Sequence, residues 1–75
     1  MPKTNFKLTV VARLGRHCSK APFLAAVADV FADPNLEPRS YRKYQSDLVD
    51  LVQFYDIQMS LAELDALIPD LVKSE

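Results

Sequence analysis

The residue types best suited to chemistry lie together in one short stretch, VARLGRHCSKAP (residues 11–22). It holds the only glycine, histidine and cysteine of the 75-residue chain. Adjacent side chains diverge along the backbone, so His17 is poorly placed to activate Cys18 as a nucleophile. Structural zinc takes four nitrogen or sulfur ligands, whereas this chain offers only these two. We therefore predict neither a catalytic pair nor a metal site here.

A corner between two helices explains the same stretch better. Gly15 follows the last apolar residue of the first element, where a left-handed residue ends a helix at low cost. Arg16 and His17 are then well placed against the partial negative charge of that helix end. Ser19 is a suitable N-cap for the next helix.

The acidic residues do not predict catalysis either. Asp47 and Asp50 are one turn apart on an expected helix surface, and Glu63 belongs to a helix cap. General acid–base pairs need a cleft that gives the two groups different environments. A single glycine also excludes a glycine-rich phosphate loop. We predict that the protein is not an enzyme and uses no cofactor.

The composition is that of one small globular domain, residues 1–75, with 49% hydrophobic and 25% charged residues. No apolar run approaches the ~20 residues that would span a membrane. Residues 1–5 lack the pattern of a secretory signal. One cysteine allows no internal disulfide, which favours a reducing, cytoplasmic setting.

Helical periodicity is clearest in the second half of the chain. Residues 40–55 carry a stripe of apolar residues behind Ser40, a predicted N-cap. Ser60 and Glu63 form a capping box that starts a helix over residues 60–73. Pro69 lacks the N–H that the helix needs, so we expect a kink or break there. The stripe of residues 40–55 consists of Tyr41, Tyr44, Leu48, Leu51, Val52 and Tyr55.

Two more helices complete the prediction. Residues 20–32 place Phe23, Val27 and Val30 on one face, and the proline-containing loop 33–40 follows. Residues 5–14 fit a helix through the spacing of Phe6, Val10 and Leu14. The predicted fold is all-α, a bundle of four short helices near 5–14, 20–32, 40–55 and 60–73.

The first segment also fits a strand, since apolar and polar residues alternate from Phe6 to Leu14. The chain has no second strand candidate, so such a strand would pair within a homodimer. Lys7, Thr9 and Arg13 would then point one way, which resembles the DNA-reading edge of a ribbon-helix-helix dimer. That arrangement, with three helices after the strand, is the alternative fold, and DNA binding through residues 6–14 is its function.

The segment FYDIQMSLAELDAL (residues 54–67) loosely resembles acyl- and peptidyl-carrier proteins after their second helix. In that family, an Asp-Ser-Leu about one helix upstream carries the phosphopantetheine arm. This chain has RSYR at residues 39–42 instead, so we assign Ser40 as a helix cap.

The charges are unevenly distributed along the chain. Residues 1–20 hold five Lys or Arg and no acid, whereas residues 46–75 have a net charge of −6. Such polarity favours oriented association with a charged partner. We therefore predict a non-catalytic protein-binding module, such as a cytosolic regulator, inhibitor or adaptor, or else an accessory subunit of a larger assembly. The predicted contact residues are Lys7, Arg13, Arg16, Lys20 and the exposed Phe54.

Overall fold

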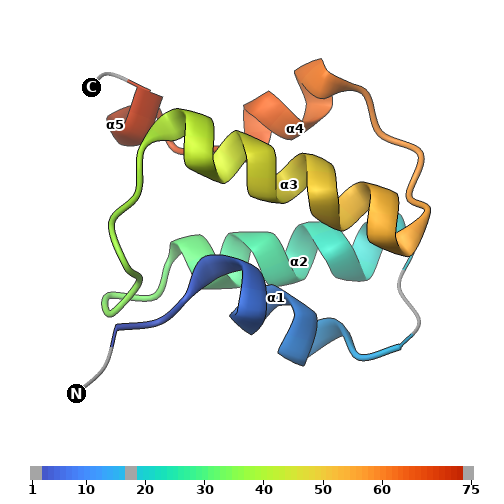
Figure 1. The fold of residues 1–75 in the computed structure, drawn as a ribbon, viewed down its shortest axis with the longest axis horizontal. Coiled ribbons are helices and arrows are strands. Elements are labelled where there is room, and N and C mark those ends of the chain that lie inside the picture. The colour runs from blue at the N-terminus through green and yellow to red at the C-terminus, as the bar shows by residue number, and fades with distance from the viewer. Residues whose placement is uncertain (1–2, 17–18, 74–75) are drawn as a thin grey trace.

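The computed structural model describes residues 3–16 and 19–73, and this part of the chain is an all-α fold. α1 and α4 each pack against both α2 and α3 (Figure 1). The predicted fold class is confirmed, although the fourth predicted helix is divided in two. The helices are α1 (Phe6–Leu14), α2 (Lys20–Phe31), α3 (Tyr41–Tyr55), α4 (Leu61–Leu67) and α5 (Asp70–Lys73).

The division falls at Pro69, as the sequence predicts. A proline disfavours the helical conformation of the residue before it, and Ile68 has extended backbone angles of φ −82° and ψ 129°. α4 therefore ends at Leu67, and α5 begins one residue after the proline. Ile68 itself remains buried in the core with 2% exposure.

The strand alternative for the first segment is wrong, because residues 6–14 form helix α1. Its N-cap Asn5 accepts a hydrogen bond from the Leu8 N–H at 2.9 Å. Phe6 and Val10, four residues apart, are fully buried, whereas Leu8 between them is 70% exposed. The four-residue helical spacing, rather than the alternation, thus decides which side chains enter the core.

The only β-type pairing among the described residues lies just before α1 and is intramolecular. Thr4 forms an isolated parallel bridge with Leu36. The Thr4 N–H donates to the Asn35 carbonyl, and the Glu37 N–H donates to the Thr4 carbonyl, both at 2.8 Å. The bridge fixes the start of the chain against the loop between α2 and α3.

An aromatic cluster joins the first three helices at the centre of the core. The ring centroid of Phe6 in α1 lies 4.8 Å from that of Phe31 in α2 and 5.3 Å from that of Tyr44 in α3. Phe31 and Tyr44 meet edge to face at 5.2 Å. Burial raises the pKa of the Tyr44 phenol, whose hydroxyl donates to the Glu37 carbonyl at 2.8 Å.

The predicted corner lies between α1, which ends at Leu14, and α2, which begins at Lys20, although Gly15 has a ψ of −142° and is not in the left-handed helical conformation. Gly15 has a φ of +70°, and its N–H donates to the Val11 carbonyl at 3.0 Å. Ser19 occupies the N-cap position of α2. The Tyr55 hydroxyl donates to the Gly15 carbonyl at 3.1 Å, which ties the corner to the end of α3. The predictions for His17 and Cys18 lie outside the described residues.

The cap of α4 supports a stability prediction. Ser60 Oγ accepts a hydrogen bond from the Glu63 N–H at 3.2 Å, while the Glu63 carboxylate pairs with Lys20 of α2 at 3.0 Å. Ser60→Ala removes the acceptor, so we expect chemical denaturation to show a free energy of unfolding lower by about 0.5–2 kcal/mol. Ser46→Ala, an exposed change inside α3, is the control and should cause no loss. An unchanged midpoint for Ser60→Ala would contradict the assignment of this cap.

Candidate functional site

The predicted cationic contact residues point to different helices. Lys7 pairs with Asp50 of α3 at 3.2 Å, and Arg13 pairs with Asp29 of α2 at 3.8 Å. Lys20, as described above, pairs with Glu63 of α4. The three cations are therefore spread around the bundle rather than gathered on one face.

The other two predicted contact residues are exposed. Phe54 is 72% exposed, and its ring meets that of Tyr55 edge to face at 4.9 Å. It follows Asp50 by one helical turn, so it lies on the side of α3 that carries the Lys7 pair. Arg16 is exposed in the turn after α1. Of the five predicted residues, Lys7, through its partner Asp50, and Phe54 thus lie on the same side of α3.

Some of the unevenly distributed charges form ion pairs within the molecule. Each pair made by Lys7, Arg13 and Lys20 has side chains 43–66% exposed. Exposed pairs of this kind contribute only about 0–1 kcal/mol each. They orient neighbouring helices weakly and leave these lysines and arginines accessible to solvent.

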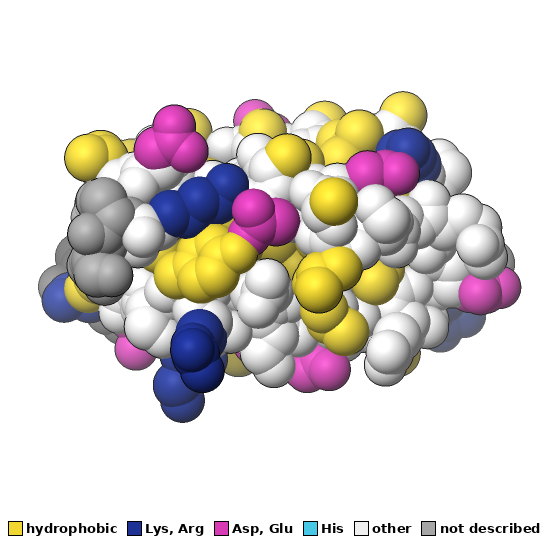
Figure 2. Space-filling model, turned by 90° about the horizontal axis from the view of Figure 1, so that it is seen from above, with side chains coloured by type: hydrophobic (Ala, Val, Ile, Leu, Met, Phe, Trp, Pro, Cys, Tyr) yellow, Lys and Arg dark blue, Asp and Glu magenta, His cyan; other side chains and the backbone are white. Residues whose placement is uncertain are grey.

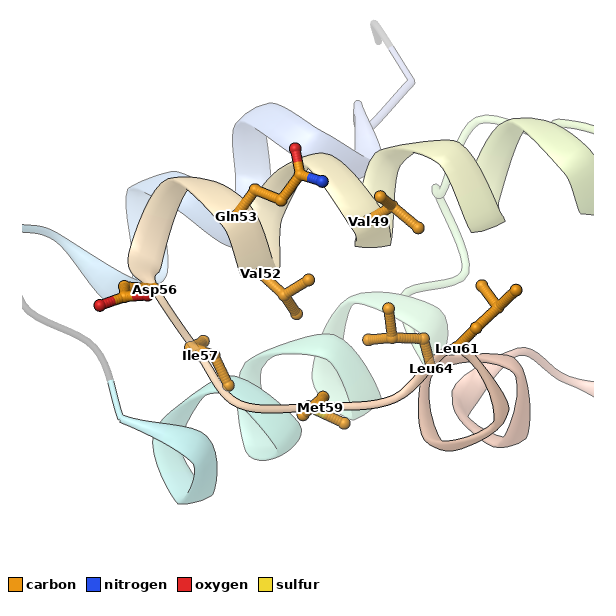
Figure 3. A pocket seen from close by; sticks show the side chains of 8 residues that line it. All are labelled: Val49, Val52, Gln53, Asp56, Ile57, Met59, Leu61 and Leu64. Atoms are coloured by element: carbon orange, nitrogen blue, oxygen red, sulfur yellow. The ribbon is translucent and has the colours of Figure 1, made fainter.

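One candidate site among the described residues is a largely apolar groove beside α3 and α4 with a volume of about 470 Å³. Figure 3 shows α3 along one side, the connection to α4 along the other, and α4 itself at one end. Six of the eight lining residues are hydrophobic. The lining consists of Val49, Val52, Gln53, Asp56, Ile57, Met59, Leu61 and Leu64.

The end of α3 builds one side of this groove. Asp56 adopts a left-handed conformation with a φ of 56°, and the Ile57 N–H donates to the Val52 carbonyl at 2.9 Å. These features define a Schellman cap, which reverses the chain direction and brings apolar residues together across the helix end. Residues 57–60 then run to α4, and Ile57 and Met59 both line the groove.

The lining residues differ in how far they are buried. Val52 and Leu64 are 7% and 2% exposed and belong to the core, so they form a fixed base. Leu61, at the first position of α4, is 57% exposed. In Figure 2, hydrophobic side chains lie along the middle of the face seen from above, among charged ones. At Leu61, the fold therefore leaves part of the apolar lining of the groove uncovered.

Sequence periodicity predicts this groove only in part. Leu61 and Leu71 have the helical spacing from the buried Leu64 that predicts burial, yet they are 57% and 85% exposed. Val49 lies off the main stripe of α3, and that displacement was the one sequence sign of a second apolar surface.

A second, more polar hollow of about 530 Å³ is lined by Asn5, Glu37, Pro38, Arg39, Ser40 and Lys43. Within residues 3–16 and 19–73, no three His, Cys, Asp or Glu side chains are grouped so that they could hold a metal ion. No helix in these ranges has both the length and the apolar character needed to cross a membrane.

Comparison with known proteins identifies no relative of this chain. No model of a known protein family matches the chain, and neither the curated proteins nor the solved structures searched contain a significant match. The fold and the site thus define a small all-α domain with an open apolar groove.

Proposed function

We propose that this protein is a non-catalytic binding module that holds a partner protein in the groove beside α3 and α4. The observation that carries the proposal is the exposed Leu61 next to a base of buried apolar side chains. A small domain has little apolar surface to spare, so a continuous apolar groove left uncovered favours an interaction site. A cytoplasmic regulator, inhibitor or adaptor would use such a module.

A protein partner suits this groove better than a small molecule. Small-molecule sites enclose most of the ligand surface. Here three lining residues, Gln53, Asp56 and Leu61, are themselves exposed. A shallow apolar base with exposed polar margins matches the core and rim of a protein interface. DNA binding by a strand dimer is not proposed, because α1 is helical.

Affinity capture with matched variants tests the proposal. Leu61→Gln keeps a helix-forming residue at the first position of α4 and removes the apolar side chain. Leu8→Gln makes the same change at a leucine that is 70% exposed on α1 and outside the groove. We expect mass spectrometry to find a protein that the wild type and Leu8→Gln capture from native lysate and that Leu61→Gln loses. If every captured protein is retained equally by Leu61→Gln, the proposal is wrong.

A further inference from the structure

The groove has one charged end. Asp56 is the only charged residue among the lining residues, and it lies where α3 ends (Figure 3). The C-terminal end of a helix carries a partial negative charge, which adds to that of the carboxylate even though the cap pairs the Val52 and Gln53 carbonyls. This end of the groove therefore attracts a cation.

The neighbouring acids differ from Asp56 in their partners. Asp50 pairs with Lys7, and Glu63 pairs with Lys20. Among the described residues, no ion pair is formed by Asp56. Lys73 is the single basic residue in positions 46–75, and it pairs with Asp65 at 3.4 Å. Within residues 3–16 and 19–73, no cation is thus paired with the carboxylate at this end of the groove.

From this charge we infer that the occupant is an amphipathic helix of another protein, with a Lys or Arg that reaches Asp56. The inference rests on the proposed function and specifies the chemistry of its partner. Apolar residues of such a helix, spaced by three, four and seven positions, would lie over Val52, Leu64 and Leu61. The basic residue would lie at the Asp56 end of the groove, next to the carboxylate and the C-terminus of α3.

A second copy of the chain fits this groove less well. In a two-fold symmetric dimer, the same surface of both copies meets itself. Two such grooves facing each other would leave both Asp56 carboxylates without a cation, because each copy contributes the same groove residues. Opposite charge between partners instead favours association and fixes orientation.

Two synthetic peptides test the inference against the full chain. Both carry the same leucine stripe over about four helical turns, with lysine at the polar positions of one and glutamate at those of the other. We expect NMR titration at about 0.15 M salt to show the lysine peptide binding at least about tenfold more tightly. The shifted amide signals should include those of Val52, Ile57 and Leu61.

Charge-matched variants locate the contact. Asp56→Asn should weaken binding of the lysine peptide about fivefold. Asp70→Asn removes the same charge from exposed α5, at the other end of the molecule (Figure 1), and should leave the affinity nearly unchanged. If both variants weaken binding equally, the peptide is attracted by the overall negative charge of the protein. The proposed contact with Asp56 would then be wrong.

The outcomes separate this inference from the proposed function. If both peptides bind equally tightly and Leu61→Gln weakens both, the groove remains the binding site. The inference that the partner is cationic would then be wrong. Peptide binding that is insensitive to Leu61→Gln would count against the groove itself. Self-association of the free chain in light scattering, abolished by Leu61→Gln, would replace the foreign helix with a second copy.

Discussion

Replacing Phe6 with alanine should lower the free energy of unfolding by about 3–5 kcal/mol, the usual loss for a large buried aromatic side chain. Phe6 has no exposed surface, and its ring contacts both Phe31 and Tyr44. The change would open a cavity where α1, α2 and α3 meet. Domains are stabilised by only about 0.05–0.15 kcal/mol per residue, so this loss is a large part of the total. We expect thermal unfolding followed by circular dichroism to show a much lower midpoint.

Phe54→Ala is the matched control for this experiment. It removes the same atoms from a ring that is 72% exposed and whose described aromatic contact is Tyr55. The expected loss is below about 1 kcal/mol, since little apolar area returns to water. If the two variants were equally stable, the central position of the aromatic cluster would be contradicted.

The helix boundaries were predictable because local chemistry determines them. Asn5, Ser40 and Ser60 each occupy an N-cap position, and in each case the side chain accepts a backbone N–H three residues later. Gly15 ends α1 with a positive φ, and Pro69 interrupts the last predicted helix. These effects act over one helical turn and therefore appear in the sequence without knowledge of the tertiary fold.

The groove was not predictable in the same way. Leu61 and Leu64 share one apolar stripe, but Leu64 is 2% exposed and Leu61 is 57% exposed. The difference arises from where α4 meets α3, which depends on the cap at Asp56 and on the path of residues 57–60. Periodicity identifies the apolar face of a helix but does not show how far along that face the neighbouring helix extends.

The ion pairs illustrate the same limit for charge. An uneven distribution of charge predicts that the basic first segment packs beside the acidic last one. Two ion pairs agree with this, since Lys7 pairs with Asp50 of α3 and Lys20 with Glu63 of α4, whereas Arg13 pairs with Asp29 of α2. Spacing along α1 already placed Lys7 and Arg13 in different directions. The identity of each acidic partner required the packing of the helices.

A second large effect is expected from Arg39, which donates a hydrogen bond to the carboxylate of Asp47. The side chains of this pair are 23% and 11% exposed, so the pair is much less accessible to water than the other ion pairs. Arg39→Met would leave Asp47 buried without its cation. Loss of one partner from a buried pair typically costs about 3–5 kcal/mol, and the partial exposure of Arg39 reduces our expectation to about 2–4 kcal/mol.

Two further variants show whether the loss arises from the isolated charge. Arg13→Met removes one partner from the exposed pair with Asp29, and we expect a loss of no more than about 1 kcal/mol. Asp47→Leu in the Arg39→Met background removes the remaining buried charge, so urea denaturation should show most of the stability restored. A double variant as unstable as Arg39→Met alone would indicate that packing by Arg39, rather than its charge, holds the loop before α3 in place.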